Sequence, residues 1–182
     1  MGLDYYVTGY GTGGTFTGTC KVLKAAYPDL QVILAEPEAA QLVKSGEKQD
    51  RLPNGAPVGP HPAWKGPHPI QGWTPMFIPK IVEEGLDRNL ADKIELISGP
   101  DAMSCAMELA QKEGIATGIS GGGTCAVGLR IAASAPPGSK VLVMLADTME
   151  RYLSTALLNQ IAADMDESER ELMLSTPTAQ MA

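Results

Sequence analysis

The chain has 182 residues, which suits one domain of ordinary size or a large part of a two-lobed protein. Hydrophobic residues make up 44% of it and charged residues 19%, values typical of a globular protein and not of a disordered or fibrous one. The net charge of −7 and the pI near 4.8 argue against a nucleic-acid partner, because binding a phosphate backbone requires clustered Lys and Arg.

Side chains that often bind metals or act as nucleophiles are few. Cys20, Cys105 and Cys125 lie far apart and lack CxxC spacing, so we expect reduced core cysteines without a disulfide framework or a zinc site. His61 and His68 alone offer little for a catalytic triad or a histidine metal site. No apolar run reaches membrane-spanning length and no secretory leader opens the chain, so the expected location is cytoplasmic, without membrane contact.

Strand-like and helix-like segments alternate along the chain. The apolar, β-branched runs that predict strands are residues 4–8, 31–35, 94–98, 115–119 and 140–146. The segments that predict helices are residues 15–27, 101–113, 124–135 and 151–163. This rhythm predicts an α/β fold: an open, mostly parallel twisted sheet with helices on both faces, in three layers.

The segment at residues 50–79 interrupts this alternation, because its many prolines exclude a regular helix or a central strand. Large apolar side chains, Trp64, Ile70, Trp73 and Phe77, indicate that the loop packs against something, as a substrate-facing wall would. We therefore expect one folded lobe at residues 1–163 containing this loop, followed by an acidic, flexible tail at residues 164–182.

Glycines and threonines alternate at residues 8–18, between the first strand and the first helix. Such a turn can form an anion cradle, because glycine backbones approach a ligand closely and the helix N-terminus is electropositive. The spacing Gly9-x-Gly11-x-x-Gly14, with Glu36 ending the next strand, also fits a dinucleotide-binding fingerprint. Three interpretations stay open here: an NAD-binding Rossmann domain, a smaller cofactor with a single phosphate, or a turn without a ligand.

A second glycine cluster, residues 120–124, opens the helix-like segment near residue 124. Ligands of open parallel sheets bind at the carboxyl ends of the strands, so both clusters are expected to face one crevice. The Ser120 hydroxyl then has two interpretations: it bonds a heteroatom of a cofactor ring, or it simply caps the helix.

Five motifs together resemble the cysteine synthases (O-acetylserine sulfhydrylases), which are pyridoxal-phosphate enzymes of fold type II. The resemblance extends over residues 4–158 and rests on Gly11-Thr12-Gly13-Gly14-Thr15, Ala35-Glu36-Pro37, Gly66-Pro67-His68-Pro69-Ile70-Gln71-Gly72 with Phe77-Ile78-Pro79, Gly118-Ile119-Ser120 and Glu150-Arg151-Tyr152-Leu153-Ser154-Thr155. Several motifs in the family's order favour this family over the nicotinamide interpretation, which leaves Glu36 with a structural role.

The resemblance implies a cofactor, pyridoxal 5'-phosphate, and a set of residues that bind it. The phosphate would lie on Gly11, Thr12, Gly13, Gly14 and Thr15, and the ring nitrogen on Ser120; the substrate-side loop would include Gln71, Gly72 and Trp73. The implied reaction converts O-acetylserine and sulfide to cysteine and acetate by β-elimination and replacement. A cystathionine β-synthase-like enzyme, an amino-acid dehydratase and a truncated, non-catalytic binding or regulatory partner stay open as alternatives.

The sequence departs from the family pattern in two respects. A bulkier run, Trp73-Thr74-Pro75-Met76, stands where the family has a glycine-rich turn. In addition, the family's Schiff-base lysine and its Asn-containing substrate loop precede the phosphate loop by a long segment, whereas ten residues precede it here. We therefore expect the C-terminal half of a two-lobed enzyme, inactive alone, that takes a small amino-acid substrate and pairs as a homodimer or with a complementary N-terminal lobe.

Overall fold

The computed structural model describes residues 2–175. The chain falls into two compact units, Met1–Arg151 and Tyr152–Ala182, which are described separately. The larger unit contains the glycine-rich segments, the proline-rich loop and all the strands of the sheet.

The larger unit is built on a sheet of four parallel strands. In chain order these are β1 (Tyr5–Gly9), β2 (Gln31–Pro37), β3 (Lys93–Ile97) and β4 (Val141–Val143). Their order across the sheet is β3-β2-β1-β4, with Val7 paired to Ile33 on one side and to Val143 on the other. The predicted parallel α/β sheet is confirmed.

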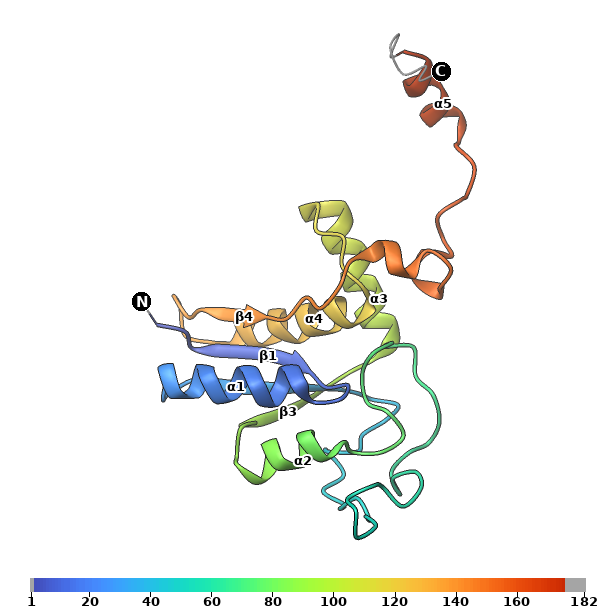
Figure 1. Cartoon of the computed structure of the whole chain (residues 1–182). Coiled ribbons are helices and arrows are strands. Elements are labelled where there is room, and N and C mark those ends of the chain that lie inside the picture. Colours follow the sequence, from blue (N-terminus) through green and yellow to red (C-terminus); the bar gives the residue numbers. More distant parts are fainter. Residues whose placement is uncertain (1, 176–182) are drawn as a thin grey trace. The chain divides into compact units, whose positions relative to one another are not determined.

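Helices cover both faces of this sheet (Figure 1). The helices of the unit are α1 (Gly14–Ala26), α2 (Lys80–Asp87), α3 (Gly99–Glu108, continued by a π-helical turn at Leu109–Glu113) and α4 (Ile119–Ser134). The path from β1 through β2 to β3 crosses the sheet in one direction, and the path from β3 to β4 returns. Because crossovers between parallel strands are right-handed, α1 and α2 lie on one face and α3 and α4 on the other.

The core explains why β2 reads as a continuous apolar run. Six of its seven residues are buried, since helices cover the strand on both faces. Toward α1, Tyr6, Val32 and Leu34 pack with Phe16 and Cys20 in one hydrophobic cluster. Burial of these side chains supplies the main stabilisation of the lobe.

Two predicted elements are wrong. Residues 115–119 form no strand; Thr117 makes a single bridge to Thr148, and its hydroxyl donates to the Asp147 carbonyl at 3.1 Å. Only three residues separate the left-handed Gly114, which ends the π-helical turn, from Gly118, which caps α4, so no room is left for a ladder. The predicted helix at residues 151–163 is replaced by two short 3₁₀ turns, Met149–Tyr152 and Ala156–Leu158.

Two helix boundaries also differ from expectation. Helix α4 begins at Ile119, five residues before the predicted start, because the glycines of the second cluster are helical. Helix α2 was not predicted, although it follows directly after Pro79. Proline there fixes an extended residue ahead of the helix without removing a needed amide donor.

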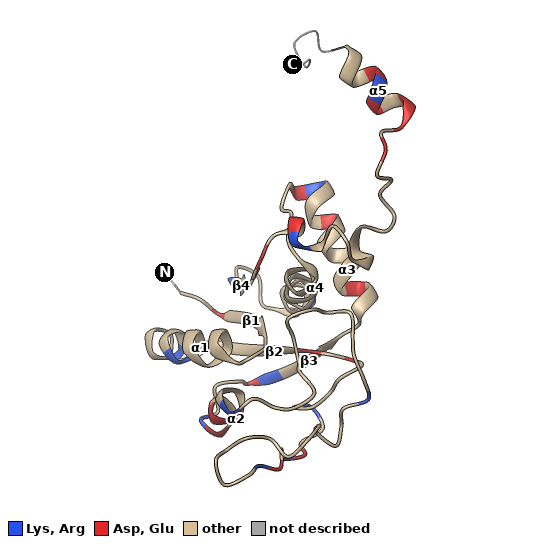
Figure 2. Ribbon diagram, turned by 45° about the vertical axis from the view of Figure 1, so that its right-hand side comes forward, with Lys and Arg blue, Asp and Glu red and all other residues tan. Residues whose placement is uncertain are grey.

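The smaller unit contains α5 (Glu167–Leu174), which starts with a reciprocal capping box between Asp166 and Glu169. The acidic tail predicted at residues 164–182 thus includes a helix in its described part, and residues 176–182 lie outside the described residues. Basic residues are distributed over several elements of the fold (Figure 2). Among the described residues, no helix has both the length and the apolar character needed to cross a membrane.

Candidate functional site

The candidate site lies where the strand order reverses. Strand β1 pairs with β2 on one side and with β4 on the other. Helix α1, which connects β1 to β2, lies on one face of the sheet, and helix α4, which precedes β4, lies on the other. Crevices at such switch points, at the carboxyl ends of the strands, are where open parallel sheets bind ligands. The glycine-threonine segment starts at this position, because Gly9 is the last residue of β1.

The start of α1 offers free backbone amides. Its first internal bond runs from the Thr17 amide to the Gly13 carbonyl, 2.9 Å. Within the described residues, no side chain caps this helix and its first turn contains no acidic residue. The amides of residues 14–16 therefore have no acceptor within the helix and, together with the helix dipole, suit an anion.

The shape of the loop depends on glycine at two positions. Gly13, with φ 95°, is left-handed, and a Cβ on it would lie 2.6 Å from Cγ2 and 2.9 Å from the backbone nitrogen of Val82. A Cβ on Gly11 would collide with the Gly72 carbonyl oxygen. In contrast, a Cβ added to Gly14 would have no neighbour within 4 Å, and Thr12 and Thr15 are exposed. The loop is thus tightly packed against α2 and the Gly72 loop, whereas Thr12, Gly14 and Thr15 are open to solvent.

The substrate-side loop packs on both glycine clusters. The Trp73 indole lies against Gly9 at the end of β1 and, through Cη2, 3.1 Å from the position a Cβ would take on Gly123 of α4. The Thr74 amide donates to the Tyr10 carbonyl at 2.7 Å, which ties the loop to the glycine segment. Thr74 has φ 35°, a conformation that favours glycine. The bulky replacement predicted from sequence therefore keeps a glycine-like backbone.

A cavity of about 320 Å³ opens between these two segments. It is lined by Gly11, Thr12, Gly72, Trp73, Pro75, Phe77 and Pro79. Of the predicted substrate-side residues, Gly72 and Trp73 line this cavity and the exposed Gln71 does not. Apolar walls with a few polar groups at one end are typical of small-molecule sites.

Ser120 lies in the first turn of α4 and is 5% exposed. The helix cap is Gly118, so the capping interpretation of Ser120 is excluded. The Ser120 carbonyl accepts a hydrogen bond from Thr124, and among the described residues its hydroxyl has no hydrogen-bond partner. Ser120 does not line the 320 Å³ cavity; it is linked to the first cluster through Trp73, which contacts both Gly9 and Gly123.

Sequence reasoning missed a buried hydrogen-bond network that supports the glycine segment. The Tyr10 hydroxyl donates to Glu36 Oε1 at 2.5 Å, and the same carboxylate accepts from the amides of Val43 and Lys44 at 2.8 and 2.9 Å. Glu36 is fully buried at the end of β2. The network leaves no free carboxylate oxygen for a ribose, so the structural role expected for Glu36 agrees with its contacts.

Burial controls the ionisation of this pair. It raises the pKa of Glu36 above its usual range, and the hydrogen bonds from Tyr10, Val43 and Lys44 oppose that rise. Burial, followed by the neighbouring Glu36 carboxylate, also raises the pKa of Tyr10 well above its usual range. Tyr10 therefore stays protonated and donates to Glu36, which fixes the start of the glycine-threonine segment.

Comparison with known proteins identifies the class of protein. The family model described as pyridoxal-phosphate dependent enzyme matches residues 1–147, and the chain belongs to this family. The match covers the switch point, the glycine-threonine segment and both sides of the cavity. The nicotinamide interpretation is therefore excluded, and the family's cofactor is pyridoxal 5'-phosphate.

Several members of the family are similar to this chain over most of its length. O-ureido-L-serine synthase from Streptomyces lavendulae is 39% identical over 166 residues, which are 91% of this chain and 45% of that protein. A probable cysteine synthase from Bacillus subtilis (strain 168) is 36% identical over 155 residues, 85% of this chain and 43% of that protein.

Solved structures show the same fold. The crystal structure of O-ureido-L-serine synthase superposes with a TM-score of 0.74 at 37% identity, covering 96% of this chain and 47% of the other. An O-acetylserine dependent cystathionine beta-synthase from Helicobacter pylori gives a TM-score of 0.67 at 35% identity, covering 85% and 44%. The chain thus spans less than half the length of the relatives it matches.

Proposed function

We propose that this chain is the cofactor-phosphate lobe of a pyridoxal-phosphate dependent enzyme that replaces the β-substituent of a serine-derived amino acid. Cysteine synthesis from O-acetylserine and sulfide, with release of acetate, is the favoured reaction. The observation that carries the proposal is the uncapped N-terminus of α1 at the switch point, packed against the loop of Gly72 and Trp73. Its open amides fit a phosphate monoester, and its cavity is of small-molecule size.

The residues of the chain take distinct roles in this proposal. The amides that begin α1, with Gly11, Thr12, Gly13, Gly14 and Thr15, hold the phosphate, and Ser120 donates to or accepts from the ring nitrogen. Bound pyridoxal phosphate supplies the electron sink for bond cleavage at the substrate α-carbon. A neutral hydroxyl at the ring nitrogen does not hold it protonated as a carboxylate would, which favours elimination and replacement over transamination.

The wall of the cavity is the element that would select the nucleophile. Trp73 and Pro75 line it, and the loop between them is held by the Thr74 amide bonded to Tyr10. The 39% sequence identity to O-ureido-L-serine synthase supports a second candidate, synthesis of an O-substituted serine, and the Helicobacter pylori structure supports cystathionine formation as a third. These candidates share the cofactor site and differ in the second substrate.

Catalysis is proposed to need a complementary lobe that carries a lysine for the cofactor aldehyde and a loop for the substrate carboxylate. The chain alone is then expected to show negligible turnover. Its expected partner is the complementary N-terminal lobe or a second copy in a homodimer. A non-catalytic role of the chain as a binding partner is the alternative that the same test addresses.

The test is a fusion of the first half of the Bacillus subtilis relative to this chain. Purified fusion would be supplied with pyridoxal phosphate and O-acetylserine, and with sulfide or homocysteine in turn. Cysteine formation that requires the fused lobe, and that falls in the Ser120→Ala variant, supports the proposal. A fusion that binds the cofactor but forms no product with either nucleophile contradicts the favoured reaction while leaving the cofactor site intact.

A further inference from the structure

Two cysteines that are twenty positions apart in sequence come together where α3 and α4 cross. The two helices approach closely at Gly122, where a Cβ would lie 2.7 Å from the Cβ of Ala106. Cys105 lies next to Ala106 on α3, and Cys125 lies one turn beyond Gly122 on α4. The close crossing thus brings a cysteine of α3 and a cysteine of α4 to the same helix–helix interface.

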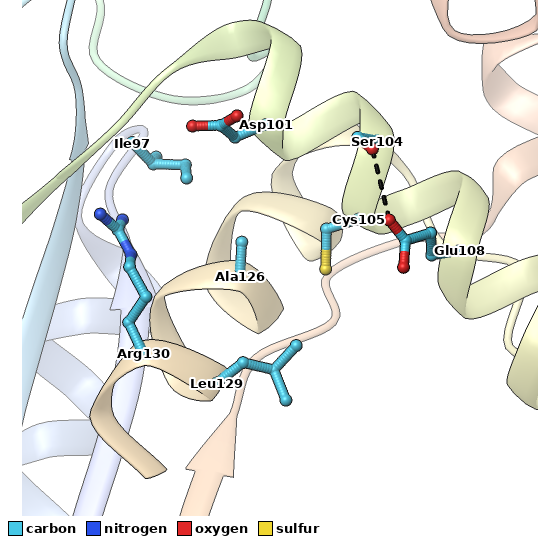
Figure 3. Close-up of a pocket in the computed structure, with 8 residues that line it drawn as sticks. All are labelled: Ile97, Asp101, Ser104, Cys105, Glu108, Ala126, Leu129 and Arg130. Atoms are coloured by element: carbon cyan, nitrogen blue, oxygen red, sulfur yellow. Dashed lines mark hydrogen bonds between the residues drawn. The ribbon is translucent and has the colours of Figure 1, made fainter. Parts of the chain in front are cut away.

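The two thiols lie close enough for each to shift the pKa of the other, and both residues are partly exposed. Cys105 also lines an open cavity of about 320 Å³ between α3 and α4, which is separate from the candidate cofactor site. In Figure 3 its sulfur points from α3 toward α4, while Glu108 is engaged with Ser104. A small reagent can therefore reach the pair from solvent.

The third cysteine differs in every respect. Cys20 is fully buried in the hydrophobic cluster beneath α1, and burial raises its pKa to about 12. The neighbouring Cys105 thiol, in contrast, lowers the pKa of Cys125 to about 7. Thiolates are the nucleophiles in disulfide exchange, and a thiol with a pKa near the ambient pH attacks most effectively. Cys20 is thus an internal control for the pair.

We propose that Cys105 and Cys125 form a reversible dithiol-disulfide site that reacts with low-molecular-weight disulfides of the glutathione type. The Cys125 thiolate attacks one sulfur of the reagent, whose S–S bond breaks and releases one thiolate. The Cys105 thiol then loses its proton to solvent and attacks the Cys125 sulfur, which releases the second thiol. In sum, two protein thiols and one reagent disulfide become one protein disulfide and two reagent thiols.

The position of the pair gives the disulfide a structural effect. It would join α3 to the helix that carries Ser120 and the second glycine cluster. The crossing of α3 and α4 at Gly122 would then be fixed covalently. This proposal does not depend on the reaction catalysed by the complete enzyme.

The test treats the native 182-residue chain with glutathione disulfide, quenches free thiols by alkylation and maps the peptides after trypsin digestion. Cleavage at Lys112 separates the two cysteines, so the disulfide appears as residues 94–112 joined to residues 113–130. We expect this joined peptide, loss of two hydrogens from the intact mass, full reversal by dithiothreitol, and Cys20 found alkylated only after denaturation.

Variants define the order of attack. Cys105→Ser should accumulate the mixed glutathione disulfide on Cys125, Cys125→Ser should slow modification of position 105 at least about tenfold, and Cys20→Ser should behave as the parent chain. The same reaction in denaturant should give all three pairings. The proposal is overturned if the native parent chain yields no joined peptide, or if Cys20 is paired as often as Cys105. Because this readout needs no variant, it holds even where a substitution impairs folding.

Discussion

Replacement of Gly13 by alanine tests whether the glycine-threonine segment packs against α2 as the structure shows. Gly13 precedes α1 with φ 95°, and an added methyl would meet both Cγ2 and the backbone nitrogen of Val82. The backbone of α2 cannot move aside like the end of a flexible side chain. The substitution therefore combines an unfavourable left-handed conformation with a steric collision.

Both effects can be given a magnitude. A left-handed conformation costs a residue with a Cβ about 1–2 kcal/mol, and overpacking of a well-packed site costs about 1–3 kcal/mol. Gly13→Ala should therefore lower the free energy of unfolding by roughly 2–5 kcal/mol, which for a lobe of this size corresponds to a decrease in Tm of roughly 4–20 °C.

The neighbouring glycine provides the matched control. Gly14 is the first residue of α1 and nothing lies within 4 Å of an added Cβ, so Gly14→Ala should be neutral or stabilise by up to about 1 kcal/mol. Urea unfolding followed by circular dichroism measures both variants. Equal stability of Gly13→Ala and Gly14→Ala would refute the packing of the glycine-threonine segment against α2.

Three further substitutions test other parts of the lobe. Tyr10→Phe removes the donor to the buried Glu36 carboxylate and should lower the free energy of unfolding by about 1.5–3 kcal/mol in urea unfolding. Burial raises the pKa of Glu36 in the folded chain above 4.5, so the folded chain holds this proton at pH values where the unfolded chain has lost it. The free energy of unfolding of the parent chain should therefore fall as pH rises from 4.5 through the folded pKa, whereas that of Glu36→Gln should not show this fall. Parallel stability–pH profiles of the two chains would contradict this. Ser98→Ala removes the cap that accepts from the Asp101 amide and should cost about 1 kcal/mol in the same assay, whereas no change would exclude the cap.

The fold could be predicted where local pattern and burial agree. Strand β2 is apolar throughout because helices cover both its faces, and the glycine-threonine segment follows β1 as the sequence indicates. The predicted strand at residues 115–119 failed because a β-branched composition does not provide a neighbour to pair with, and Thr117 finds only Thr148. Pairing is a tertiary property, which a single segment does not encode.

At the candidate site, too, local features could be predicted from the sequence and long-range contacts could not. The sequence indicated that the two glycine clusters lie between a strand end and a helix, and the structure places them at the starts of α1 and α4. The cofactor-binding role predicted for their residues stays a prediction. The sequence did not indicate the Tyr10–Glu36 bond or the position of Trp73 between Gly9 and Gly123, since these contacts join segments 26 or more residues apart. It also did not indicate the meeting of Cys105 and Cys125, which depends on how closely two helices cross at Gly122. Long-range contacts of this kind require the folded arrangement.

The most direct test of the cofactor-phosphate site is a titration of the isotopically labelled chain followed by amide NMR shifts. Pyridoxine 5'-phosphate is the suitable probe, because it keeps the ring and the phosphate but has no aldehyde to react with surface lysines. We predict saturable shifts at the amides of Gly11, Thr12, Gly13, Gly14 and Thr15, which are absent with pyridoxine and weakened in Gly13→Ala. Shifts confined to other regions, or equal shifts with pyridoxine, would contradict the assignment of this loop to the cofactor phosphate.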